Sequence, residues 1–151
     1  MQAESGSWKA LVQVARQLGA SVGAEQLKDE LAAYNPLIPQ GSELVATVMF
    51  EIEDAVRREL ILARLGGVED HFFLQVGPER AAAVQEGDVD RTREDGKTSS
   101  VHFLRFPMSQ AQKTAFKDPA VPVMVGCDHE LYAHLAVLGP DTRAELARDL
   151  D

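Results

Sequence analysis

A histidine and an arginine lie inside an apolar segment rich in aromatic and β-branched residues, residues 101–106 (VHFLRF). Strands with apolar side chains on both faces are usually covered, so His102 and Arg105 need polar partners there. One interpretation is structural, with His102 hydrogen-bonded in the core and Arg105 paired with a carboxylate such as Glu51. The other is a pocket at the strand ends, where Arg105 fixes an anion and His102 moves a proton.

A second group of candidate residues lies in residues 126–134 (GCDHELYAH). Here the pattern predicts a strand followed by a helix that Asp128 caps and that continues to about Leu138. In the first turn of such a helix the dipole disfavours a charged His129, which leaves it neutral and able to accept a proton or bind a metal. The alternative is a surface histidine beside a cap.

Histidine spacing gives little support to a metal site. His129 and His134 are five residues apart, about 140° around a helix, so they would not share an ion. A site assembled from separate elements is the remaining metal hypothesis, with His102, His129 and a carboxylate of Glu51 or Asp128 as ligands. The sequence identifies no cofactor.

Residues 96–98 (GKT) match the end of a phosphate-binding loop, but the rest of that motif is missing. Arg91 stands where the first glycine would be, and the residues after Thr98 predict a strand where the motif needs a helix. We therefore do not expect a nucleotide site here.

Composition and charge narrow the class of protein. The 151 residues are the size of one domain, and 24 acidic against 15 basic residues give a net charge of −9. Such a chain is repelled by phosphate backbones and anionic lipids, which argues against nucleic acid and membrane partners. The N-terminus (MQAESGSW) has no signal-peptide pattern, so we expect a cytoplasmic protein. Cys127 is the only cysteine, which excludes an intramolecular disulfide.

Hydrophobic periodicity predicts a single α+β domain. It has an N-terminal segment of two helices (1–35) and an α+β core (42–151), in which helices pack on a mostly antiparallel or mixed sheet of about four to five strands. Residues 85–97 are polar and predict an exposed loop. The strands are expected at residues 44–52, 71–76, 80–84, 99–106 and 121–125. In the core, helices are expected at residues 54–65, 109–117 and 128–138 and after Gly139–Pro140.

Four ordered strings, AYNPLIPQGSELVATVMFE, GVEDHFFLQV, EDGKTSSVHFLRF and GCDHELY, together resemble a bacterial family, the domain of unknown function 3501. The similarity runs from about Glu30 to Leu150. It departs at Cys127, where the family pattern has isoleucine, so a thiol mechanism is not a family property. The resemblance points to these candidate ligand-binding residues: Glu51, Lys97, His102, Arg105, Asp128, His129 and Tyr132.

The family has no assigned activity, but its members tend to be encoded near rubrerythrin-like and iron–sulfur redox proteins. The resemblance therefore implies an accessory role in redox or peroxide metabolism, with a redox protein as partner. Family members usually carry a longer, strand-containing N-terminal part, so a sheet edge of this chain could be bare and covered by a second subunit.

We thus expect an accessory or ligand-binding protein, acting as a homodimer, with a polar pocket built from His102, Arg105, Glu51 and the junction 128–132. One alternative is a small enzyme that uses His102 and His129 as an acid–base or metal pair. Another is an interaction module in which His102 is purely structural.

Overall fold

The computed structural model describes residues 28–29, 31–32, 35, 38–86 and 91–151. The chain divides into two compact units, Met1–Pro36 and Leu37–Asp151, and the second contains all the strands described below. The two helices predicted within residues 1–35 lie almost wholly outside the described residues. Among the described helices, none is both long and apolar enough to span a membrane.

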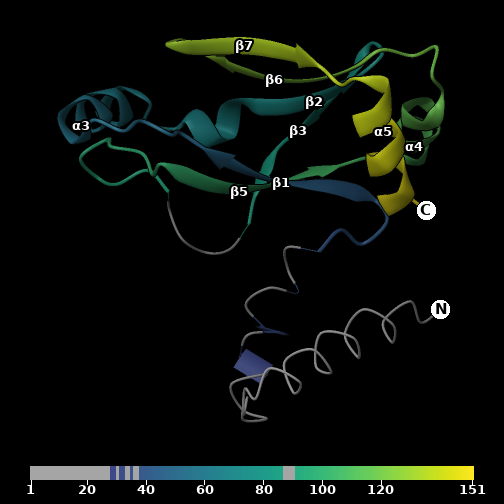
Figure 1. Ribbon diagram of the computed structural model, residues 1–151, viewed down its shortest axis with the longest axis horizontal. Helices are drawn as coiled ribbons and strands as arrows, with labels where there is room; N and C mark the ends of the chain where they lie inside the picture. Colours follow the sequence, from purple (N-terminus) through teal and green to yellow (C-terminus); the bar gives the residue numbers. More distant parts are fainter. Residues whose placement is uncertain (1–27, 30, 33–34, 36–37, 87–90) are drawn as a thin grey trace. The chain divides into compact units, whose positions relative to one another are not determined.

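The Leu37–Asp151 unit is α+β, as predicted, but its described strands form two antiparallel sheets instead of one (Figure 1). The segment 79–85 explains the difference, because it leaves one sheet after a short strand and joins the other after Ala83. The three-stranded sheet has the order β1 (Glu43–Met49), β5 (Val101–Pro107), β4 (Val84–Gln85). The four-stranded sheet has the order β3 (Glu79–Ala82), β2 (Phe72–Val76), β6 (Val123–His129), β7 (Tyr132–Val137).

Local capping signals place two of the helices as predicted. The Asp54 carboxylate accepts a hydrogen bond from the Arg57 N–H at the start of α3 (Ala55–Arg64). Ser109 and Gln112 form a reciprocal capping box at the start of α4 (Gln110–Lys117). The remaining helical elements are η2 (Val68–His71), α5 (Pro140–Leu146) and η3 (Ala147–Asp149).

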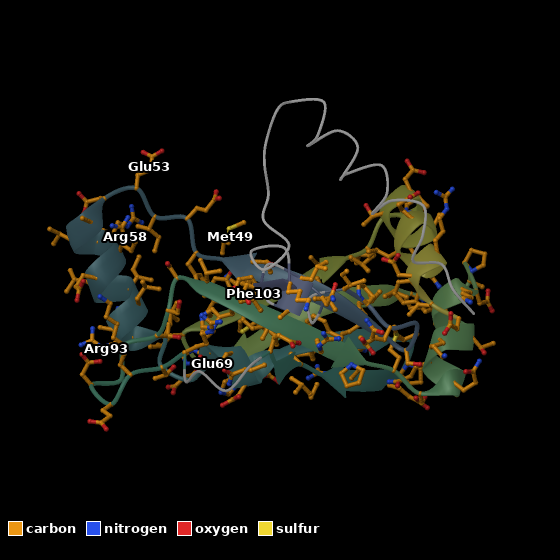
Figure 2. The ribbon with its side chains drawn as sticks, turned by 90° about the horizontal axis from the view of Figure 1, so that it is seen from below. Met49, Glu53, Arg58, Glu69, Arg93 and Phe103 are labelled. Carbon is orange, nitrogen blue, oxygen red and sulfur yellow. The ribbon has the colours of Figure 1, made fainter. Side chains whose placement is uncertain are left out.

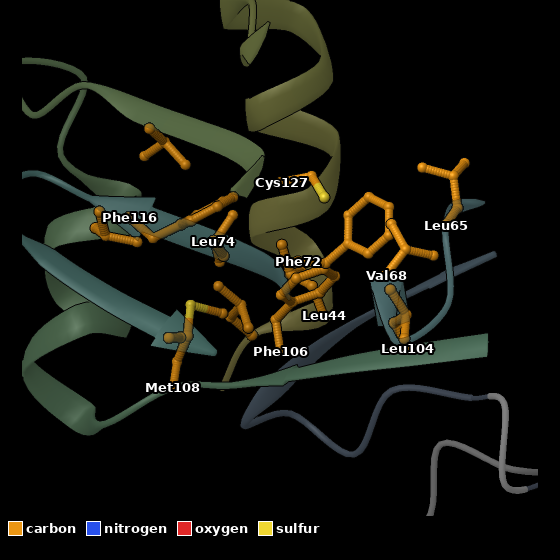
Figure 3. Packing of buried hydrophobic residues seen from close by; sticks show 14 residues of the cluster. Leu44, Leu65, Val68, Phe72, Leu74, Leu104, Phe106, Met108, Phe116 and Cys127 are labelled. Carbon is orange, nitrogen blue, oxygen red and sulfur yellow. The ribbon is translucent and has the colours of Figure 1, made fainter. Parts of the chain in front are cut away.

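The core is one cluster of buried apolar side chains supplied by both sheets and by α4 (Figure 3). Burial of this kind is the main favourable term in folding, at about 25 cal/mol per Å² of apolar surface. Its members include Leu44, Val68, Phe72, Leu74, Leu104, Phe106, Met108, Phe116, Val123 and Cys127.

The helix predicted for residues 128–138 is wrong, because this segment completes a β-hairpin. Asp128 pairs with Ala133 and His129 with Tyr132, so only Glu130 and Leu131 form the turn. Alanine and leucine favour a helix locally, but β6 offers a full row of backbone groups on the side away from β2, and β7 pairs with it. The non-local pairing overrides the local preference.

A buried arginine fastens α5 to the rest of the unit. Arg143 donates from its guanidinium to four backbone oxygens at the end of α4 and the entry to β6, including Phe116 O at 2.7 Å. A planar group with several donors suits such a convergence of carbonyls. No pattern in the sequence distinguished Arg143 from an exposed helix residue.

Candidate functional site

The predicted site residues do not meet in one pocket. His102 lies in the core, and Arg105 pairs with other residues of the three-stranded sheet and its continuation. Lys97 pairs with Glu59 of α3 at 2.6 Å, and Glu51 is exposed beyond the end of β1. The remaining predicted residues, Asp128, His129 and Tyr132, lie together at the β6–β7 hairpin.

His102 is fully buried, with a relative exposure of 0%. Its Nε2 atom lies 2.8 Å from the carbonyl oxygen of Ser99, which can only accept, so Nε2 carries the proton. The Nδ1 atom has no hydrogen-bond partner within the described residues. Burial lowers the pKa of His102, partly offset by the Ser99 hydrogen bond, and a neutral ring is the form that fits this environment.

The nearest carboxylate belongs to Glu69, which sequence reasoning did not single out. Glu69 is also buried and accepts from the hydroxyls of Thr92 (2.7 Å) and Thr98 (3.2 Å). The Thr98 oxygen also lies 3.4 Å from His102 Nε2, so this threonine stands between the two ionisable side chains. We call Glu69, Thr98 and His102 the His102 cluster.

The prediction of an exposed loop at residues 85–97 is confirmed for residues 93–95, whereas Thr92 turns inward. Thr92 accepts from the Gly67 N–H at 2.8 Å while it donates to Glu69, and Thr92 and Thr98 form an isolated bridge. Thr92 therefore ties the described part of the loop to η2. Figure 2 shows Arg93 at the α3 end of the unit and Glu69 farther toward the middle. Nothing in the polar composition showed which hydroxyls would turn inward.

Arg105 pairs with carboxylates, as the structural interpretation predicted, but Glu51 is not one of them. It donates to Glu43 at 2.6 Å and to Glu86, and all three side chains are largely buried. The register explains the choice, because Arg105 pairs with Val45 and Glu43 lies two residues away on the same face of β1. Glu51 lies past Met49, the last residue of β1.

The second group of polar side chains is centred on Asp128, and we call His71, Arg80, Asp128 and His129 the hairpin cluster. The two carboxylate oxygens of Asp128 lie 3.0 Å from His71 Nδ1 and 3.4 Å from an Arg80 guanidinium nitrogen. The rings of His71 and His129 meet edge to face, with centroids 5.1 Å apart. Arg80 also lies over the ring of Phe73, 3.9 Å from its centroid.

Within the hairpin cluster, both ring nitrogens of His129 contact the backbone, whereas His71 uses only one of its ring nitrogens. His129 Nδ1 accepts from the Leu131 N–H (3.2 Å), and its Nε2 lies 3.3 Å from the carbonyl oxygen of Gly66, so both ring nitrogens are engaged. Since His129 ends a strand, the helix dipole expected around it is absent. His71 uses Nδ1 for Asp128, and within the described residues its Nε2 has no partner.

His71 was missed because its role depends on strand pairing. Phe72 pairs with Cys127 across β2 and β6, and continuing that register by one residue brings His71 opposite Asp128. The two residues are 57 apart in sequence. Once the β2–β6 register is known, the contact follows from it.

Tyr132 belongs to a row of aromatic rings that runs from His134 to His102. Its ring meets Phe50 at 5.4 Å and His134 at 4.4 Å between centroids, and Phe50 meets His102 at 5.9 Å. Such edge-to-face contacts stabilise packing and fix ring orientation. Tyr132 thus has a packing role. No described hydrogen bond joins it to Asp128 or His71.

The predicted metal ligands His102 and His129 lie apart, and the thiol of Cys127 is buried. The described residues contain no group of three or more His, Cys, Asp or Glu side chains that could hold a metal ion, and His102 and His129 are each engaged separately. Cys127 is buried, which raises the pKa of its thiol. The backbone N–H of His129 opposes this shift. A protonated, buried thiol is a poor nucleophile.

Comparison with known proteins agrees with the fold and adds no activity. A family model described as "Protein of unknown function (DUF3501)" matches residues 13–150. The chain is similar to the crystal structure of a novel protein of unknown function from Burkholderia pseudomallei K96243. The two are 41% identical with a TM-score of 0.77, over 89% of this chain and 69% of that one. No curated protein matches the chain.

Proposed function

The chain belongs to the DUF3501 family of proteins of unknown function, and we propose that it is an accessory binding protein whose hairpin cluster holds an anionic group. The recognised chemistry is that of carboxylate or phosphate oxygens. The family resemblance is the sole ground for the further proposal that its partner belongs to redox or peroxide metabolism.

One observation carries this proposal: the Asp128 carboxylate holds His71 and Arg80 together while leaving donors of both open to solvent. The side chain of His71 is 44% exposed, that of Arg80 53% and that of Asp128 56%. The Arg80 guanidinium and the His71 imidazole stand side by side on this carboxylate, in a chain of net charge −9. Arginine and imidazolium N–H groups are strong donors to oxyanions.

The site is open, which favours an anion presented by a larger molecule over a small ligand enclosed in a cavity. Two surface hollows lie away from this cluster, at residues 92–95 and beside the start of α3 at residues 51–61. A buried pocket is the usual setting for small-molecule sites. An exposed cluster on the end of a rigid sheet is better suited to docking a partner's acidic or phosphorylated group.

The enzyme alternative has a specific observation in its favour. Because Asp128 fixes the proton of neutral His71 on Nδ1, the exposed Nε2 is left as a base, an arrangement that general acid–base catalysis uses. The acid–base pair would then be Asp128 and His71. The predicted pair, His102 and His129, has its ring nitrogens buried or engaged.

Nuclear magnetic resonance spectra of the four imidazoles test the binding function. We expect acetate or inorganic phosphate to shift the His71 signals in the wild type. Arg80→Gln should weaken that response about tenfold, or about 1.4 kcal/mol. His134→Ala is the matched control, since it removes an exposed histidine outside the cluster. Equal shifts for His71 and His134, or none at tens of millimolar anion, would overturn the proposal.

A further inference from the structure

The edge strand β7 is unusually open for an apolar strand. Residues 133–137 are all exposed, on both faces of β7. Leu135 and Val137 are 57% and 71% exposed, and Leu131 in the turn is 51% exposed. A contiguous exposed apolar strip of this kind marks an interaction surface.

Within the part of the chain that the structure describes, the backbone of β7 also has one unpaired side. The Leu138 N–H donates to Val123 O at 2.9 Å, and hydrogen-bonded pairs alternate along an antiparallel ladder. The even-numbered residues therefore bond to β6, while Ala133, Leu135 and Val137 direct their N–H and C=O groups outward. The strand contains no proline or charged residue and its register with β6 is unbroken, so the usual protections of an edge strand are missing.

We propose that β7 pairs antiparallel with β7 of a second copy of this chain, joining two four-stranded sheets into one. The outward groups allow a symmetric register with Leu135 on the twofold axis and Ala133 opposite Val137 of the partner subunit. In that register the apolar side chains of Ala133, Leu135 and Val137 from both copies lie side by side on one face.

The neutral strand and its self-complementary register favour a second copy as the occupant. The chain has a net charge of −9, so two copies repel each other over most of their surfaces. The strand YAHLAV has no acidic or basic side chain apart from His134, so it is complementary to itself. This inference goes beyond the proposed function, since the hydrogen bonds and ion pairs of the hairpin cluster involve no residue of β7.

Two valines of equal exposure give a matched test in the full chain. Val137 on β7 is 71% exposed and Val56 on α3 is 70% exposed. In sedimentation equilibrium at about 10 μM we expect a dimer for the wild type and for Val56→Lys. Val137→Lys should raise the dimer Kd at least tenfold, because in this register it places a charged side chain against the apolar Ala133 of the partner subunit at each end of the shared edge.

A second variant tests the backbone pairing itself. Ala133→Pro removes an N–H that β6 does not use, so the monomer keeps its ladder while the dimer loses hydrogen bonds. We expect weaker association with an unchanged far-ultraviolet circular dichroism spectrum. A wild type that stays monomeric at about 100 μM overturns the proposal. The proposal is also overturned if the dimer survives both Val137→Lys and Ala133→Pro. It is overturned as well if Val56→Lys weakens the dimer as much as Val137→Lys does.

Discussion

The His102 cluster and the hairpin cluster use similar side chains for different purposes. Each sets a histidine near a carboxylate, Glu69 with His102 in one and Asp128 with His71 in the other. In the core, Thr98 separates the two groups, and burial keeps His102 neutral. At the hairpin, carboxylate and imidazole touch directly and about half of each side chain faces solvent.

The difference shows that burial decides what such a pair can do. Desolvation makes a buried ion pair costly, and hydroxyl donors satisfy Glu69 without requiring a cation. The exposed pair gains little stability because water and salt screen it, but it stays open to another molecule. The buried cluster therefore holds the fold, and the exposed one is available for binding.

The largest expected difference between the clusters is in stability. His102→Ala should lower the free energy of unfolding by about 3 kcal/mol, because it empties a fully buried position. His71→Ala should change it by less than about 0.5 kcal/mol. Urea unfolding of both variants measures this, and equal effects would show that the two clusters do not differ in this way.

A smaller effect is expected from removing one hydroxyl. Thr98→Val keeps the shape of the side chain but takes a donor from Glu69, which should cost about 1–3 kcal/mol. Thr47→Val, at an exposed position of β1, is the matched control and should be nearly neutral. If both variants unfold at the same urea concentration, Thr98 does not support the buried carboxylate.

The pH dependence of stability should separate the two histidines. The pKa of His102 is lowered in the folded state, so the unfolded chain binds its proton first as pH falls below about 6.5. The contribution of neutral His102 to the free energy of unfolding is complete above that pH. It is lost as the pH falls toward the pKa of His102 in the folded state. Its slope is at most about 1.4 kcal/mol per pH unit.

His102→Gln should reduce this slope in urea titrations between about pH 7 and 5, because it removes the titrating group. His134→Gln, the exposed control, should leave it unchanged. A slope that survives in the His102 variant would assign the acid sensitivity to other groups.

The smallest effect is expected at the hairpin ion pairs. Asp128→Asn should lower stability by less than about 1 kcal/mol, and the difference should shrink further in about 1 M salt. Thermal unfolding at low and high salt measures this. A large, salt-independent loss would mean that the hairpin cluster is as structural as the buried one.

What could be predicted from the sequence was mostly local. The caps at Asp54 and Ser109, and the strands β1, β2 and β5, follow from signals within a few residues. The β7 strand was mistaken for a helix because its pairing with β6, not its composition, decides its conformation. The division into two sheets depended on such pairings as well.

The candidate site shows the same limit. The need of Arg105 for a carboxylate was readable from one strand, but its partners Glu43 and Glu86 depend on the register of β1 and on the chain beyond β4. Asp128 was singled out from its own segment, whereas His71 acquires its role through a contact across 57 residues. Periodicity reveals that a polar group is buried or exposed, but not which distant group it meets.

The two threonines that donate to Glu69 also bear on the order in which parts of this unit can fold during synthesis. Thr92 and Thr98 follow Glu69 by 23 and 29 residues. A nascent chain that ends at β4 therefore lacks both of these hydroxyl donors. Strand β5, which lies between β1 and β4, is missing at that moment too. The first half of this unit therefore reaches its final packing only after the second half has been made.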